Sequence, residues 1–323
     1  KLTCFTWEMM LLKKRMNKVI SLMGPTASGK TDLAIYLSEK FNLDIISVDS
    51  VMIYKYFNIG SAKPDKNTLL KFPHKMIDIL EPNEKYSVAR FYNDLIIQIN
   101  TIHKLGKIPI LVGGSMMYFK TFFSGGLSEL NIVTKEVKKE VRDMFENQSP
   151  SYMYSYLKKI DLESAKKIHP NDSYRISRML EIFFSNDEKP STILKKCSKN
   201  VQYFNNLNLS IIPILRNSIH ENIEKRLDVM INDGLLEEVS KLLITHKSSE
   251  MPAMSTIGYR QVNKYLSGDI TFSDMRNNIL SSTRQLAKRQ ITWLRHLDAT
   301  TVYSSLDYDN IEKRISYFLE EKK

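Results

Sequence analysis

A phosphate-binding loop near the start of the chain constrains the fold more than any other feature of the sequence. Residues 24–31 read GPTASGKT and fit the pattern G-x-x-x-x-G-K-[ST]. In such a loop the glycines let several backbone N–H groups converge on one anion, the lysine adds positive charge, and the last hydroxyl contacts magnesium. The residues predicted to hold a phosphate group are therefore Gly24, Pro25, Thr26, Ala27, Ser28, Gly29, Lys30 and Thr31, with Thr31 as a ligand of Mg²⁺.

The segments on both sides of this loop have the character that a phosphate-binding loop requires. Val19–Met23 is a short apolar run typical of a buried strand, and Lys30–Lys40 carries apolar residues at helical spacing. The loop therefore lies where a strand ends and a helix begins, so that the helix dipole also favours an anion. The motif leaves open whose phosphates are bound.

Two further apolar runs predict strands whose carboxyl ends lie at the same edge of the sheet as the phosphate loop. Asp44–Val48 leads directly into Asp49, and Ile108–Val112 leads into Gly113-Gly114-Ser115. The helix expected over Val88–Lys104 separates them, which indicates a parallel sheet with helices on both faces. Because ligands of such sheets lie at the carboxyl ends of the strands, Asp49 is predicted to face the phosphate site. A helix cap or an outer contact to magnesium is the alternative role for Asp49.

The middle of the chain changes character. Between residues 127 and 200 the pattern predicts helices only, and Leu209–Leu215 then returns to strand composition, with Pro213 indicating an edge or irregular strand. The sequence thus predicts an α/β fold, a P-loop parallel sheet flanked by helices, with an inserted all-helical subdomain. Its expected parts are an N-terminal extension (1–15), the first part of the core (16–126), the insert (127–203), and a completion of the core with basic C-terminal helices (204–323).

The charge of the chain favours a polyanionic partner. Lys and Arg outnumber Asp and Glu by 47 to 36, a formal net charge of +11. The longest predicted helix, Ser273–Leu297, has an apolar arc and a basic one, and no acidic residue occurs between Arg284 and His296. Arg284, Lys288 and Arg295 on the basic arc are predicted to contact nucleic acid. An ordinary solvated face is the alternative, as it is for the pair Arg175 and Arg178.

Composition and the chain's first residues exclude several classes of protein. The two cysteines, Cys4 and Cys197, lie far apart, which argues against a disulfide framework or a zinc site and favours the cytoplasm. No apolar run approaches the roughly 18 residues of a membrane span. Within residues 1–15 the basic run Lys13–Arg15 follows the apolar run Met9–Leu12, the reverse of the order in a signal peptide. We therefore interpret residues 1–15 as an extension that precedes Met16.

The motifs taken together resemble a known family. In order, GPTASGKT, ISVDS, IGSAKP, PHKMIDI, IPILVGGSMMYFK, HPNDSYRISR, GYRQ and TRQLAKRQITWLRH are similar to segments of the bacterial tRNA dimethylallyltransferases, from about Lys18 to His296. The resemblance implies transfer of a dimethylallyl group from dimethylallyl diphosphate to N6 of adenosine 37 in the anticodon stem–loop of tRNA. The phosphate loop would then bind this diphosphate. The resemblance also implies catalytic residues: Asp49 as general base, Thr26 and Lys30 at the leaving group, and Arg226 closing on the diphosphate.

By the same resemblance a larger set of residues would contact tRNA. These are Asp49, Ser50, Val51, Met52, Ser115, Lys138, Tyr174, Arg175, Ile176, Ser177, Arg178, Ser255, Thr256, Ile257, Gly258, Tyr259 and Arg260. The chain departs from the family at Met52, where glutamine is common, and at Ser61 and Ser115, where threonine is usual. The serines keep a hydroxyl, whereas Met52 loses an amide that can bond a base. A monomer is expected.

Three other functions are compatible with parts of the sequence. A nucleotide or metabolite kinase shares the loop and the sheet, but it gives no reason for the basic helix. An RNA-binding module switched by a nucleoside triphosphate needs an acidic magnesium ligand after the loop, which Asp49 can provide. Transfer of the prenyl group to free AMP is a close relative of the implied reaction; the helical insert and the basic helix favour a large RNA acceptor over it.

Overall fold

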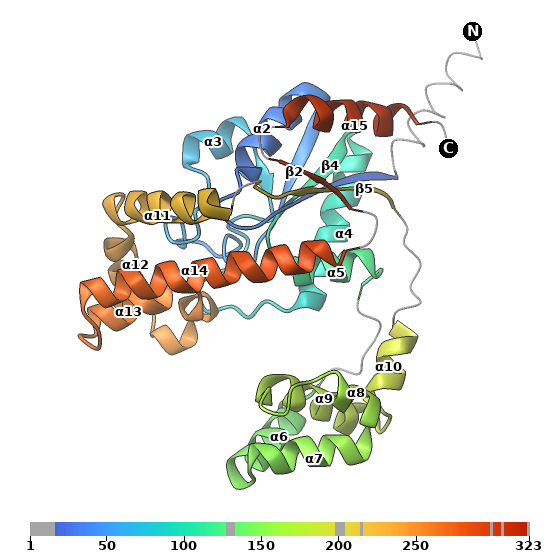
Figure 1. Cartoon of the computed structure of the whole chain (residues 1–323), viewed down its shortest axis with the longest axis vertical. Coiled ribbons are helices and arrows are strands. Elements are labelled where there is room, and N and C mark those ends of the chain that lie inside the picture. The colour runs from blue at the N-terminus through green and yellow to red at the C-terminus, as the bar shows by residue number, and fades with distance from the viewer. Residues whose placement is uncertain are drawn as a thin grey trace. The chain divides into compact units, whose positions relative to one another are not determined.

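The computed structural model describes residues 17–126, 133–197, 204–213, 216–297, 300–304 and 307–321. The extension expected over residues 1–15, Met16 and Cys4 lie outside these ranges. The described residues form two compact units: one lies within residues 1–120 and 203–323, and the other lies within residues 121–202 (Figure 1). Each unit is described by itself below.

A parallel sheet forms the centre of the larger unit. In the described residues it has six strands in the order β3-β2-β4-β1-β5-β6. The strands are β1 (Lys18–Met23), β2 (Leu43–Val48), β3 (His74–Lys75), β4 (Ile108–Gly113), β5 (Asn205–Ile211) and β6 (Thr301–Tyr303). Every residue of β1 and β4 is buried, as expected for strands covered on both faces. The predicted α/β fold is confirmed.

Helices cover both faces of this sheet. On one face α2 (Lys30–Phe41) and α15 (Tyr308–Glu320) pack their apolar residues, Leu33 and Ile311 among them, against Ile20 of β1 (Figure 1). On the other face α4 (Val88–Lys104) contacts β2 and β4 and begins at Ser87, whose hydroxyl accepts the N–H of Arg90. The same unit contains α3 (Lys66–Lys71), and α5 (Met116–Phe123) begins in it just after β4. This arrangement leaves the carboxyl ends of the strands free for a site.

A helical layer forms a second core in the larger unit. It consists of α11 (Arg216–Asn232), α12 (Leu235–Thr245), α13 (Tyr259–Leu266) and α14 (Phe272–Arg295), with 3-10 turns at Ser248–Glu250 and Pro252–Ser255. Its apolar residues pack with Tyr54 and Phe57 from the loop after β2. Thr271 and Asp274 cap the start of α14. Because α14 runs from Phe272 to Arg295, the long helix predicted over Ser273–Leu297 is confirmed.

The smaller unit is all-helical in its described residues. It contains α6 (Lys135–Asn147), α7 (Pro150–Ile160), α8 (Leu162–Lys166), α9 (Ser173–Asn186) and α10 (Pro190–Cys197). Val141, Leu157 and Leu180 belong to its own hydrophobic core. The predicted inserted helical subdomain is therefore present. In neither unit does a described helix combine the length and apolar character needed to cross a membrane.

One predicted strand differs from the structure, and another strand is very short. The strand expected over Leu209–Leu215 ends at Ile211, and it is an inner strand between β1 and β6, so the prediction of an edge strand was wrong. Pro213 follows the strand, where its missing N–H interrupts no ladder. The segment of residues 73–79 forms a strand only at His74–Lys75, because Met76 and Asp78 adopt positive φ.

Candidate active site

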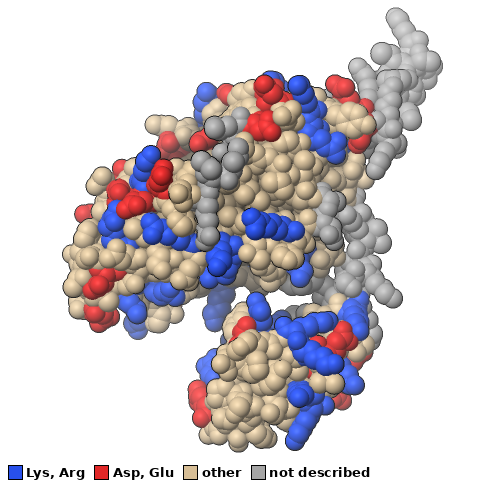
Figure 2. All heavy atoms as spheres, viewed as in Figure 1, with Lys and Arg blue, Asp and Glu red and all other residues tan. Residues whose placement is uncertain are grey.

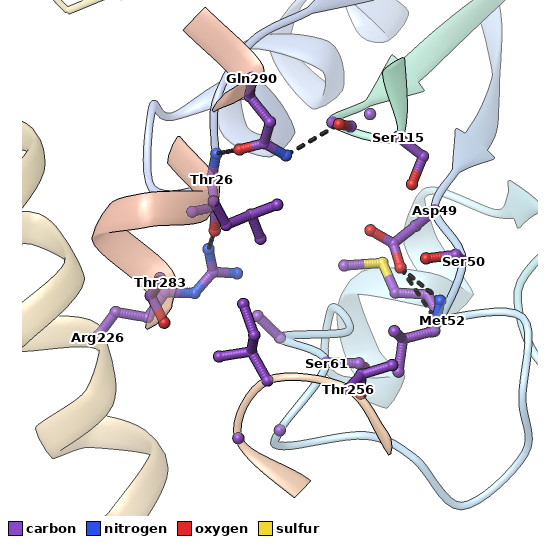
Figure 3. Close-up of a pocket in the computed structure, with 18 of the residues that line it drawn as sticks. Thr26, Asp49, Ser50, Met52, Ser61, Ser115, Arg226, Thr256, Thr283 and Gln290 are labelled. Atoms are coloured by element: carbon purple, nitrogen blue, oxygen red, sulfur yellow. Dashed lines mark hydrogen bonds between the residues drawn. The ribbon is translucent and has the colours of Figure 1, made fainter. Parts of the chain in front are cut away.

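A cleft of about 860 Å³ opens in the larger unit beyond the carboxyl ends of β1, β2 and β4 (Figure 3). It brings together side chains that are far apart in the sequence. The predicted site residues that line it are Thr26, Lys30, Thr31, Asp49, Ser50, Val51, Met52, Ser115, Arg226, Ser255, Thr256, Ile257, Gly258 and Arg260. The phosphate loop, the strand-end aspartate and the segment before α13 thus share one cavity.

The phosphate loop is held in a conformation that needs small residues. Gly29, at the start of α2, has φ of 79°, and Ala27 has φ of 60°. A Cβ on Gly24 would lie 2.6 Å from the backbone oxygen of Ile211, so only glycine fits between β1 and β5. The loop therefore presents backbone N–H groups at a helix N-terminus, the arrangement that binds phosphate.

Lys30 lies folded over this loop. Its Nζ donates hydrogen bonds to the carbonyl oxygen of Pro25 at 2.5 Å and to Oγ of Ser28 at 3.3 Å. Desolvation, and secondly the positive charge of Arg226, lower the pKa of Lys30 to about 7, while Asp49 opposes this shift. The cations of the site repel each other in a dehydrated setting, which a bound anion would relieve.

Arg226 reaches the same loop from α11. One of its guanidinium nitrogens donates to Oγ1 of Thr26 at 3.2 Å (Figure 3). Desolvation lowers the pKa of Arg226 from its usual value, and the charges of Asp49 and Asp32 raise it in return. An arginine stays charged in spite of such a shift. Thr26, Lys30 and Arg226 together offer a hydroxyl and two cations to an anion.

Asp49 combines a fixed oxygen with one that is open to the cleft. Its Oδ1 accepts the backbone N–H groups of Val51 at 2.8 Å and Met52 at 3.1 Å, which tightens the turn after β2. Among the described residues no hydrogen bond reaches Oδ2, and the close-up shows the carboxylate beside the open space (Figure 3). The capping role and the role of proton acceptor are therefore compatible, because each uses a different oxygen.

Gln290 is a site residue that the sequence analysis missed. From α14 its Oε1 accepts the backbone N–H of Thr26 at 2.9 Å, and its Nε2 donates to the backbone oxygen of Gly114 at 2.9 Å (Figure 3). The side chain thus joins the phosphate loop to the loop after β4. The sequence did contain an indication of this role, because Gln290 lies on the same arc of the helix as Ala287 and Leu294. A polar residue on a buried face needs a specific hydrogen-bond partner.

The wall opposite the phosphate loop is formed by the turn after β2, by the loop that contains Ser61 and by the segment before α13. Oγ of Ser47 lies 3.8 Å from the sulfur of Met52. The hydroxyl of Ser61 donates to the backbone oxygens of Phe57 at 2.8 Å and Asn58 at 3.0 Å. Ser61 therefore uses its hydroxyl to shape its own loop.

Other residues assigned to tRNA by resemblance lie outside this cleft. In the smaller unit Tyr174 is 83% exposed, and Lys138 is exposed on α6. The side chains of Arg175 and Arg178 on α9 form ion pairs with Asp172 at 3.4 Å and Glu181 at 2.9 Å. Ser177 on the same helix is partly buried.

Two of the residues assigned to tRNA have side chains that are buried in this structure. Ile176 is completely buried in the core of the smaller unit, and Tyr259 is completely buried beneath the cleft of the larger one. Neither side chain is exposed to a partner in this structure, so a contact of these two residues with tRNA would use their backbone. The reason is the helical period: apolar residues within a motif face the core, while their neighbours in the sequence face solvent.

The basic arc of α14 is less uniform than its sequence indicates. Lys288 and Arg295 are exposed, but Arg284 is partly buried and lies 3.8 Å from a carboxylate oxygen of Glu224 on α11. Figure 2 shows acidic as well as basic side chains on the visible face of this unit. The stretch of α14 from Arg284 to Arg295 contains no acid, and Glu224 of the neighbouring α11 supplies one beside Arg284.

The described residues contain no group of three His, Cys, Asp or Glu side chains that could hold a metal by themselves. Thr31 and Asp49 nevertheless place a hydroxyl and a carboxylate on the wall of the cleft. Mg²⁺ commonly binds through one or two protein oxygens and takes its other ligands from phosphates and water. The residues therefore fit a magnesium ion that arrives with a phosphorylated ligand, with Thr31 as the predicted protein ligand.

Comparisons with known proteins find relatives that match most of the chain. The family model "IPP transferase" matches residues 52–297. A tRNA dimethylallyltransferase of Coxiella burnetii (strain RSA 493 / Nine Mile phase I) is 40% identical over 306 residues, which cover 94% of this chain and 98% of the relative. That of Legionella pneumophila (strain Corby) is 42% identical over 292 residues, 90% of this chain and 93% of the relative.

Solved structures are similar over the same extent. The tRNA delta(2)-isopentenylpyrophosphate transferase of Staphylococcus epidermidis superposes with a TM-score of 0.67 at 30% identity and covers 94% of this chain and 99% of its own. A eukaryotic dimethylallyltransferase, described as acting on tRNA, superposes with a TM-score of 0.79 at 28% identity over 94% of this chain and 77% of its own. The likeness thus spans both units.

Proposed function

This chain belongs to the IPP transferase family, and from that premise we propose that it transfers a dimethylallyl group from dimethylallyl diphosphate to N6 of adenosine 37 of tRNA, releasing diphosphate. The observation that carries the proposal is the shared cleft. It sets an anion-binding loop with Lys30 and Arg226 opposite an aspartate with an open oxygen. One side suits a diphosphate leaving group, and the other suits an amine that must lose a proton.

The reaction needs one bond to form, one to break and one proton to move. N6 of the adenine attacks C1 of the dimethylallyl group, and the bond between C1 and the diphosphate oxygen breaks. Oδ2 of Asp49 takes the N6 proton, because it is the carboxylate oxygen that no backbone N–H occupies. Charge develops on the departing diphosphate, where Thr26, Lys30, Arg226 and the loop amides stabilise it.

The surroundings of the reaction follow from the same proposal. Mg²⁺, when bound through the diphosphate and Thr31, would neutralise part of the leaving group's charge. The target adenosine must leave its stack to reach a cleft of this kind. We place the reaction in the cytoplasm and expect the enzyme to act as a monomer on the anticodon stem–loop.

Nucleoside analysis tests the proposal directly. Unmodified tRNA is incubated with the protein, Mg²⁺ and dimethylallyl diphosphate, digested, and analysed by mass spectrometry. We expect adenosine carrying one added C5H8 unit at position 37, and none when ATP replaces the prenyl donor. Phosphoryl transfer from ATP without prenylation would instead favour a kinase, and prenylation of free AMP would favour the smaller acceptor.

Binding of the diphosphate is expected to take up a proton above neutral pH. With a pKa of about 7, Lys30 is largely neutral in the free protein at pH 8, and a diphosphate beside it raises that pKa. The affinity for diphosphate should therefore fall as the pH rises from 7 to 9. Calorimetry at pH 8 in two buffers of different ionisation enthalpy would measure the uptake, and Lys30→Arg should abolish it.

The exposed cations of α14 are expected to make salt-dependent contacts with tRNA. The double variant Lys288→Gln/Arg295→Gln should lower the magnitude of the log–log salt slope of tRNA binding by about 0.7 to 0.9 per lost phosphate contact. Arg284→Gln is the matched control, because Arg284 lies beside Glu224. Fluorescence anisotropy at several salt concentrations measures both. A slope unchanged in the double variant would identify an ordinary solvated face.

A further inference from the structure

One carboxylate outside the cleft holds a loop that forms part of its wall. Glu238, on the first turns of α12, accepts hydrogen bonds from three consecutive backbone N–H groups: Asn58 at 3.0 Å and Ile59 at 2.8 Å on Oε2, and Gly60 at 3.2 Å on Oε1. Its Oε1 also accepts the hydroxyl of Tyr259 at 2.7 Å. Both oxygens of this carboxylate are therefore engaged, and three of its four partners belong to one loop.

The loop is built to fit this partner closely. A Cβ on Gly60 would lie 2.6 Å from the ring of Tyr259, so residue 60 must be glycine for the loop to reach Glu238. At the far end of the loop Lys63, whose side chain is almost fully buried, donates to the backbone oxygen of Tyr54 at 2.9 Å and pairs with Asp78 at 2.6 Å. The loop from residue 58 to residue 63 is thus fastened at both ends.

This loop and the segment before α13 meet at the cleft. Gly60, Ser61 and Ala62 line the cavity together with Thr256 and Gly258. A Cβ on Gly258 would lie 3.9 Å from the backbone oxygen of Gly60. Ser61 and Thr256 lie on the side of the cavity away from Thr26 and Arg226 (Figure 3). Glu238 and Tyr259 therefore join two backbone segments that form the wall opposite the phosphate loop.

We propose that Glu238 is a positioning residue that fixes the wall of the cleft receiving the tRNA adenosine, and that it does so through the backbone of residues 58–60 and the hydroxyl of Tyr259. The inference rests on the proposed function, since it assigns this wall to the RNA substrate and the phosphate loop to the prenyl donor. The carboxylate is required because a glutamine has a single acceptor oxygen. Its NH₂ group would face the N–H of Gly60, donor against donor.

Steady-state kinetics of the full-length protein, with either substrate varied, test this inference. Glu238→Gln and Glu238→Ala should raise the KM for tRNA at least about tenfold, the scale of losing hydrogen bonds to a charged group. The KM for dimethylallyl diphosphate should stay within about twofold, because no bond to Thr26, Lys30 or Arg226 is removed. Tyr259→Phe keeps the ring against Gly60 and removes only the hydroxyl, so its effect should have the same selectivity and a smaller size.

The neighbouring acid provides the matched control. Glu237 is exposed on the same turn of α12, so Glu237→Gln removes the same charge without touching the loop. If the Glu238 variants and Glu237→Gln have the same KM for tRNA, or if Glu238→Gln weakens both substrates equally, the inference is wrong. If the wild-type protein forms no prenylated tRNA, the proposed function itself fails. The two failures are therefore separate results.

Discussion

Asp49→Asn is expected to lower the rate of prenyl transfer by about two to four orders of magnitude, the usual contribution of a general base. Asparagine keeps the shape of the side chain, and its amide oxygen can still accept the N–H groups of Val51 and Met52 that Oδ1 accepts in the wild type. What it loses is the basic second oxygen. Single-turnover transfer to tRNA measures the rate, and a binding assay should show nearly unchanged affinity for tRNA.

Asp49→Ala separates the two roles of this carboxylate. Alanine removes the proton acceptor and also the partner of both backbone N–H groups, so tRNA affinity should fall in addition to the rate. A near-normal transfer rate for Asp49→Asn would show that the residue only shapes the turn after β2. Equal tRNA affinities for the two variants would show that the turn does not matter for binding.

Lys30→Ala is expected to reduce turnover by about a hundredfold or more, the scale typical of losing one preorganised contact to developing charge. The reason lies in where Lys30 is held. Its Nζ already sits at the loop, bonded to Pro25 and Ser28, so it can meet the leaving group without a large rearrangement. Transfer rates at saturating dimethylallyl diphosphate give the effect on the chemical step.

Lys30→Arg is the control for charge as opposed to shape. Arginine keeps the positive charge but is bulkier, so it should retain a larger part of the activity than alanine. Calorimetry on the wild type adds a second check. Tight binding of ATP with no response to dimethylallyl diphosphate would contradict the assignment of the loop to an isoprenoid diphosphate.

Much of the sheet and of the phosphate site could be predicted because both depend on local patterns. A buried strand followed by GPTASGKT and a helical period fixes the loop, and strands that run into Asp49 and Ser115 place these residues at the same edge. Parallel topology explains why these segments, separated in the sequence, meet in one cleft. The site residues that come from strand ends are the ones that sequence patterns place most directly.

The remainder depends on contacts between distant helices, which a local pattern does not contain. Gln290 reads as one more polar residue in a basic helix until the structure places it between Thr26 and Gly114. From the sequence Glu238 looks like a solvated acid of α12, whereas in the structure it accepts the backbone N–H groups of residues 58–60. For Arg284 the sequence predicts a site residue where the structure shows an ion pair. No acid lies near it in the sequence of α14, but Glu224 of α11 lies beside it in the structure.

The single side chain of Gln290 links the phosphate loop to α14, the helix that we propose contacts tRNA. The N–H of Thr26 that it occupies belongs to the loop assigned to the donor, and the helix that carries it presents Lys288 and Arg295 to solvent. Whatever free energy this link contributes must act equally in both directions. The factor by which bound diphosphate changes the affinity for tRNA is then the factor by which bound tRNA changes the affinity for diphosphate.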